Sequence, residues 1–206
     1  MRIKMAKRLI TAISMGALVT LSQLSQAGII GNDAINRATS DGWSNFVLGL
    51  TTETFTTAGT VTNWNVYTNN AGSLGMLLLR NTGANNYTVI GADFESASAG
   101  LNSFTFNADT GSSNVLAGDI LGLYIGSAKV DFDYNSSNDI VNWCGNNGCV
   151  SNLSQLDAGQ SLTLSGGPQG RSYSANVSVA VSEPSTIALF GLSLLGLGFA
   201  RRQSKA

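Results

Sequence analysis

Short apolar runs alternate with Gly, Asn, Ser and Asp along the middle of the chain. In the segment 129–135, Val130, Phe132 and Tyr134 alternate with charged residues, which is the two-residue period of a strand with one buried face. No segment of this region shows a sustained 3.6-residue apolar stripe between helix caps. The pattern predicts strands at about 44–50, 60–68, 75–80, 86–94, 101–107, 119–126, 129–135, 139–144, 160–165 and 172–181.

Many short strands separated by turn residues are typical of all-β domains. We therefore expect an all-β fold, with a β-sandwich or jelly-roll-like body at residues 28–181 and a flat barrel as the alternative. The two ends of the chain have a different character and predict targeting segments at 1–27 and 182–206. About 154 residues remain between them, enough for one domain with its own core.

The N-terminal end has four basic residues, then an apolar stretch from about residue 9 to 21, then Ser25-Gln26-Ala27. Small residues at the −3 and −1 positions predict a secretory signal peptide, helical and cleaved between Ala27 and Gly28. The alternative interpretation is an amphipathic first helix of the mature fold. Clustered positive charge before an uncharged apolar run favours the signal peptide.

The C-terminal end consists of a short polar stretch, an uncharged apolar run from Ile187 to Ala200, and a basic terminus at 201–206. Fourteen helical residues span roughly 21 Å, short of the ~30 Å hydrocarbon core, so this transmembrane helix would be a weakly held anchor. The positive-inside rule places Arg201, Arg202 and Lys205 in the cytoplasm and the body outside it. This topology agrees with the signal peptide.

These three parts, in this order, resemble the PEP-CTERM sorting signal of Gram-negative exopolysaccharide producers. The residues that carry the resemblance are Ser182, Glu183, Pro184, Ser185 and Thr186, followed by the apolar run and the basic end. Ser182 stands where the commonest form of the motif has Pro. The resemblance implies export, anchoring on the periplasmic side of the inner membrane, and processing by exosortase. The alternative is an ordinary single-span anchor.

Charge is distributed unevenly along the chain. Residues 28–181 hold four basic and eleven acidic residues, a formal net charge of −7, although the whole chain has −1. Nucleic acid is therefore not an expected partner. The chain also has no histidine, which removes the usual zinc ligand and any Ser-His-Asp triad.

Cys144 and Cys149 flank a Gly-Asn-Asn-Gly turn. In an oxidising compartment, this spacing predicts a disulfide that fixes a hairpin loop. The alternative, a redox-active pair, more often has C-x-x-C spacing beside a helix.

Two local strings suggest sites that use carboxylates. Asp109 begins an Asp-Thr-Gly-Ser string like that of pepsin-like proteases, but the chain lacks the second such string that a proton-sharing dyad needs. Asp131, Asp133, Asn135 and Asp139 have calcium-loop spacing, but an EF-hand needs Gly and Glu where Ser136 and Asn142 stand. We expect an ordinary turn at Asp109 and an exposed strand face at 131–139, with a looser calcium loop as the alternative for the latter.

The body's tryptophans and tyrosines could include a sugar-stacking platform, although aromatic residues in strands are more often core residues. Trp143, beside the cysteine loop, is the first candidate for such a platform. We expect a noncatalytic surface or exopolysaccharide-matrix (biofilm) protein that has no catalytic residues, metal or cofactor. Its expected partners are the secretion machinery and exosortase, and exopolysaccharide is a candidate. The alternatives are a carbohydrate-binding module and, less favoured, an enzyme.

Overall fold

The computed structural model describes residues 26–134 and 139–181, and these residues are almost entirely strands and turns. The first half of the described chain contains β1 (Gln26–Gly31), β2 (Thr39–Ser40), β3 (Phe46–Thr54), β4 (Gly59–Thr68), β5 (Gly72–Gly83), β6 (Asn86–Ala97) and β7 (Gly100–Thr105). The second half contains β8 (Thr110–Gly111), β9 (Asn114–Val115), β10 (Ile120–Ile125), β11 (Asp131–Tyr134), β12 (Ile140–Trp143), the 3-10 helix η1 (Leu153–Leu156), β13 (Ser161–Thr163), β14 (Gly166–Tyr173) and β15 (Ala175–Val181).

The smaller sheet has five strands in the order β1-β15-β4-β7, and β9 pairs with β4 beside this path. Its strands alternate between a buried and an outward face, as period-two sequences should. In β4, Trp64 and Val66 are fully buried, whereas Asn65 and Tyr67 point outward and are partly exposed. This sheet therefore covers one side of the core and presents a polar face on the other.

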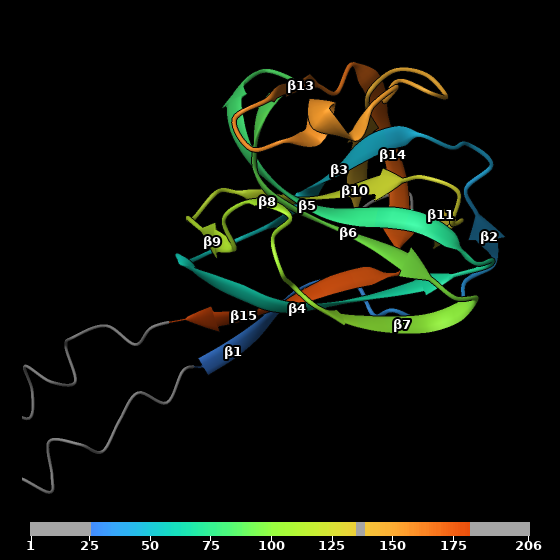
Figure 1. Cartoon of the computed structure of the whole chain (residues 1–206), viewed down its shortest axis with the longest axis horizontal. Helices are drawn as coiled ribbons and strands as arrows, with labels where there is room; N and C mark the ends of the chain where they lie inside the picture. The colour runs from blue at the N-terminus through green and yellow to red at the C-terminus, as the bar shows by residue number, and fades with distance from the viewer. Residues whose placement is uncertain (1–25, 135–138, 182–206) are drawn as a thin grey trace, which may run out of the picture. The chain divides into compact units, whose positions relative to one another are not determined.

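The larger sheet has ten strands in the order β13-β6-β5-β10-β3-β12-β14-β11-β2, with β8 paired to β6. It curls into a half-barrel, and its long strands β5 and β6 bend toward β13 (Figure 1). Neighbouring strands in it run antiparallel; for example, Leu123 of β10 lies opposite Leu48 of β3 and Met76 of β5.

The main core lies between the two sheets. It joins Val66 and Val177 of the smaller sheet to Leu48, Met76 and other residues of the larger sheet, and the four named side chains are each at most 1% exposed. Full burial of one such side chain contributes about 1.5–3 kcal/mol, so this interface is the principal source of the fold's stability.

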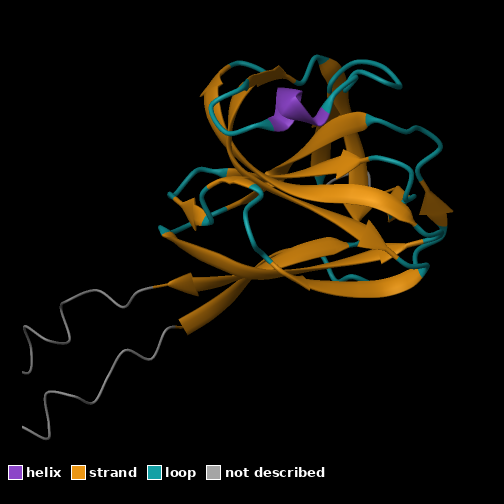
Figure 2. Cartoon of the chain, in the orientation of Figure 1, coloured by secondary structure: helices purple, strands orange, loops and turns teal. Residues whose placement is uncertain are grey.

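A second core lies on the opposite face of the larger sheet. Val47, Leu77 and Tyr124 belong to it, together with Leu156 and Leu164 from the segment that carries η1 and β13. The short helix η1 is drawn in purple in Figure 2. The central strands are thus buried on both faces, which explains why β5 and β10 have nearly continuous apolar sequences. Glycines make room for this layer: a Cβ at Gly49 would lie 2.6 Å from Leu164 Cδ1.

The predicted all-β class is confirmed, as two antiparallel sheets of which one is a half-barrel. The expected single strand at 172–181 is wrong, because the chain passes from one sheet to the other at Ser174, between β14 and β15. The strand at 26–31 was not expected, because these residues were assigned to the cleavage region. The predicted signal-peptide helix and tail helix lie outside the described residues.

Candidate functional site

The first and last strands of the described chain are neighbours in the smaller sheet. The Asn32 N–H donates to the Ala175 carbonyl at 2.9 Å, so the end of β1 meets the start of β15 and the two strands run antiparallel. Ile30 packs against the main core, which holds β1 in place, whereas Ile29 is 70% exposed. The start of β1 and the end of β15 therefore lie at the same end of the sheet (Figure 1).

The predicted processing sites adjoin this strand pair. The expected cleavage between Ala27 and Gly28 falls inside β1, so cleavage would leave Gly28 as the first residue of a shorter strand. At the other end, β15 stops at Val181, directly before Ser182. Ser182, Glu183, Pro184, Ser185, Thr186, Arg201, Arg202 and Lys205 lie outside the described residues.

A disulfide joins Cys144 and Cys149, whose Cα atoms are 6.2 Å apart, in agreement with their spacing in the sequence. The turn between them uses two positive-φ glycines, Gly145 and Gly148. Asn147 Oδ1 accepts a hydrogen bond from the Ser44 N–H at 2.8 Å, and the Gly148 N–H donates to the Ser44 carbonyl at 3.0 Å. The loop is thus fixed to the segment that leads into β3.

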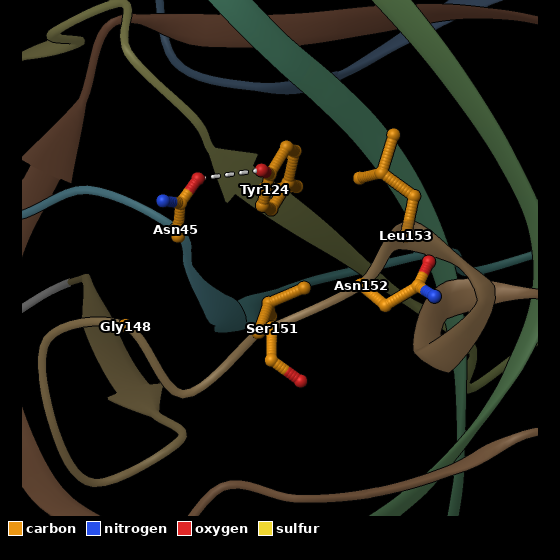
Figure 3. A pocket seen from close by; sticks show the side chains of 7 residues that line it. Asn45, Tyr124, Gly148, Ser151, Asn152 and Leu153 are labelled. Carbon is orange, nitrogen blue, oxygen red and sulfur yellow. Dashed lines mark hydrogen bonds between the residues drawn. The ribbon is translucent and has the colours of Figure 1, made fainter.

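Two shallow pockets lie beside this loop and share Val150. The first has a volume of about 280 Å³ and is lined by Asn45, Tyr124, Gly148, Val150, Ser151, Asn152 and Leu153 (Figure 3). The second has about 300 Å³ and is lined by Val47, Cys144, Cys149, Val150, Gln155, Gln160, Ser161, Leu162 and Thr163. Their walls offer amides and hydroxyls and carry no charged side chain, so they suit a neutral polar ligand.

The floor of the first pocket is fixed by a hydrogen bond from Tyr124 Oη to Asn45 Oδ1 at 2.9 Å. Asn45 has φ +53°, a left-handed conformation that Asn tolerates better than most residues. Burial raises the pKa of the Tyr124 phenol above its ordinary value. Tyr124 is one of the tyrosines considered for sugar stacking, but no sequence pattern indicated its partner Asn45, because nothing local links positions 79 residues apart.

Trp143 is not an open sugar-stacking platform. Its indole packs against the main core and covers Gly166 of β14 so closely that a Cβ there would clash with the ring. Trp64 is fully buried, whereas Trp43 is 40% exposed. Of the three tryptophans, Trp43 has the most accessible side chain, yet it lines neither pocket.

Asp109 and the nearby Asp93 of β6 bind separate donors. Exposed Asp109 accepts the Phe94 N–H at 2.8 Å, and Asp93 accepts Trp64 Nε1–H at 2.7 Å. Burial raises the pKa of Asp93, and the charges of Glu95 and Asp109 raise it further. Each carboxylate thus holds a strand or a core side chain in position.

The aspartates with calcium-loop spacing also bind different partners. Asp133 pairs with Arg37 at 3.1 Å, and the hydroxyl of Ser172 donates to Asp139. Asp131 accepts the Arg37 N–H at 3.4 Å and is only 1% exposed, so the expected exposed face is wrong at this residue. Asn135 lies outside the described residues. Within 26–134 and 139–181, no group of three or more acidic or cysteine side chains is arranged to hold a metal ion.

The end of β15 leads into a recognised sequence signal: residues 180–202 match the family model of the PEP-CTERM protein-sorting motif. The chain carries a PEP-CTERM motif. The match begins at Ala180, within β15, and covers the predicted motif residues, the apolar run and both arginines. No curated protein matches the chain.

The PEP-CTERM motif implies export, processing by exosortase and sorting to the cell surface. The protein is accordingly an exosortase-sorted protein with an all-β body. Within the residues that the structure describes, no helix is long and apolar enough to cross a membrane. The apolar run 187–200, which was predicted to do so, is outside that part of the chain.

Proposed function

We propose that this protein is a noncatalytic component of the cell surface or exopolysaccharide matrix, which exosortase releases from its membrane-held tail. The observation that carries the proposal is that the PEP-CTERM motif begins within β15, the strand between β1 and β4 in the smaller sheet. The motif thus continues directly from the folded body, without a long linker. Such an arrangement suits a protein whose task is to display a rigid domain.

The contacts of the body's charged side chains support a structural role. Arg80 forms a bidentate pair with buried Asp119, at 2.8 Å for both hydrogen bonds. Arg37 pairs with Asp133, Arg171 contacts Asp41, and Lys129 donates to the carbonyl of Trp43. All four basic side chains of the described body are therefore engaged in holding strands and loops together.

Deletion of the gene in its own host tests this proposal. Loss of the protein should change the cohesion or composition of the extracellular matrix, and the full chain should restore it. A variant in which Glu53, Asp93 and Asp139 are each changed to the corresponding amide should restore it equally well, because no carboxylate performs chemistry. A wild-type phenotype in the deletion strain, or failure of the folded amide variant, would contradict the proposal.

A carbohydrate-binding role is the second candidate, and the two uncharged pockets beside the disulfide loop favour it. Amide and hydroxyl groups on a fixed loop can bind sugar hydroxyls, and Tyr124 adds an aromatic wall. A glycan array probed with the exported protein tests this role. Gln160→Ala should weaken any binding at the second pocket, whereas Ser178→Ala, on a distant strand of the other sheet, should not.

A further inference from the structure

The smaller sheet is uncharged. β1, β4, β7, β9 and β15 contain no Asp, Glu, Lys or Arg, although the body has eleven acidic and four basic residues. Its outer face carries rows of Asn, Ser and Thr across neighbouring strands. In one row, Ser103 Oγ donates to Asn65 Oδ1 at 2.7 Å, and Asn65 Nδ2 donates to Asn176 Oδ1 at 2.9 Å. The charged residues of the body therefore all belong to other segments, although the Glu53 carboxylate accepts the Gly31 N–H of β1 at 3.1 Å, at the opposite edge of the sheet from β7.

β7 is the last strand of this sheet and has one unpaired edge. The Phe106 N–H donates to the Thr62 carbonyl, so these two opposite residues form a hydrogen-bonded pair. Hydrogen-bonded and non-hydrogen-bonded pairs alternate along antiparallel strands. Trp64–Phe104 is therefore also a hydrogen-bonded pair, and Asn65–Ser103 is a non-hydrogen-bonded pair. The backbone groups of Leu101, Ser103 and Thr105 must therefore point away from β4. Among the described residues, none donates to or accepts from these groups beyond the sheet.

The other sheet edges offer less backbone. β2 has two residues and β13 has three, and β1 would keep only four after cleavage at Ala27. β7 has six residues, and it lacks the Lys, Pro or bulge with which proteins normally protect an edge strand. Its side chains at 101, 103 and 105 are exposed, with Leu101 at 63%. β7 is thus the best template in the described chain for pairing with another strand.

We propose that β7 pairs with β7 of a second copy of this chain, antiparallel and about a two-fold axis at Ser103. Ser103 would then face Ser103 of the second copy, and Leu101 would face Thr105. Each of these three pairs exchanges two backbone hydrogen bonds. The two five-stranded sheets become one continuous sheet across the dimer.

Charge favours a second copy as the occupant of this edge. Two bodies of net charge −7 repel each other over most of their surfaces. Contact through β7 instead brings together strands that contain no charged residue in either copy. A symmetric pair also places the apolar Leu101 beside the methyl group of Thr105, so both ends of the short interface are matched.

Cysteine cross-linking of the full chain in its host tests the pairing and its register. Ser103→Cys should give a covalent dimer with a short thiol cross-linker, because opposite side chains in an antiparallel pair have Cβ atoms about 4.5–5.5 Å apart. Leu101→Cys alone should give little dimer, and co-expression of Leu101→Cys with Thr105→Cys should restore it. Absence of a dimer for surface-localised Ser103→Cys would overturn the proposal, as would equal cross-linking at all three positions.

Charge substitution provides a second measurement on the exported protein. Ser103→Lys places two like charges opposite each other and should raise the dimer dissociation constant roughly tenfold or more. Ser178→Lys is the matched control, because Ser178 lies on the same outer face but on the interior strand β15, and should leave the constant unchanged. Equal weakening by both variants would indicate face-to-face stacking and overturn the edge pairing. A wild-type protein that stays monomeric and binds a neutral glycan on this face would also overturn it.

Discussion

Trp64 Nε1 donates a 2.7 Å hydrogen bond to Asp93 Oδ2 between the two sheets, where Trp64 is 0% and Asp93 2% exposed. Trp64 belongs to β4 of the smaller sheet, and Asp93 belongs to β6 of the larger one. Because both groups are buried, loss of one leaves the other without its partner, at a cost of about 1–3 kcal/mol. This bond fixes how the sheets are stacked.

The Trp64–Asp93 bond gives a matched pair of variants. Asp93→Asn keeps a carbonyl that accepts the indole N–H, whereas Asp93→Ala leaves the indole donor unpaired. We expect Asp93→Ala to be less stable than Asp93→Asn by about 1–3 kcal/mol in urea unfolding followed by tryptophan fluorescence. Equal unfolding midpoints would show that the hydrogen bond contributes nothing to the stacking.

Asp41 should make stability depend on pH. Burial raises its pKa from 3.8 to about 6, against the opposing effects of Tyr173, Arg171 and Lys129. The folded protein therefore holds the Asp41 proton more tightly than the unfolded chain does. The contribution of this proton to the free energy of unfolding is complete below about pH 4 and is lost as the pH rises through 6. Between pH 3.5 and 7, the free energy of unfolding of the wild-type protein should fall by on the order of 3 kcal/mol relative to that of Asp41→Asn.

Thermal unfolding of both proteins across this pH range measures the difference. Asp133→Asn is a useful control, because hydrogen bonds from Ala38 and Arg37 lower the pKa of exposed Asp133, so its effect on stability has the opposite sign. Parallel pH profiles for wild type and Asp41→Asn would show that Asp41 ionises normally in the folded protein.

The disulfide should be complete in the exported protein. Intact-mass analysis after alkylation without reductant should find no free thiol at Cys144 or Cys149. Replacement of both by Ser opens a six-residue loop, and the chain-entropy model gives a loss of about 2 kcal/mol. Because the loop is also held through Ser44, we expect the double variant to fold but to have weakened pocket walls. Two alkylated cysteines in the wild-type protein would contradict the predicted disulfide.

The sorting motif should control processing rather than folding. Changing Glu183 and Pro184 to Ala keeps the apolar run, so the variant should remain anchored in the inner membrane as the longer, uncleaved form. Immunoblots of membrane, surface and medium fractions measure this, with wild type and a chain ending at Val181 as references. Wild-type processing of the double variant would instead favour an ordinary single-span anchor.

Sequence alone was sufficient for the features that depend on local pattern. The alternation at Val130, Phe132 and Tyr134 predicted β11, and the apolar run at 119–126 predicted β10. The faces of β11 were predicted less well than the strand itself, because Asp131 is 1% exposed and Tyr134 is 70% exposed. The PEP-CTERM motif was recognisable because a sorting signal is a linear stretch read in order along the chain. The disulfide needed only two cysteines around a turn.

Tertiary structure decided which strands pair and what each face contacts. β1 and β15 meet from opposite ends of the body, and Asn45 meets Tyr124 across 79 residues, which no local period records. Asp93 is buried because a tryptophan of the other sheet binds it, although aspartate as a residue type is usually exposed. Trp143, the first candidate for a sugar-stacking platform, packs on the core, and only the position of β14 determines what covers its ring. Local sequence fixes the period of each strand, whereas long-range packing chooses its partners.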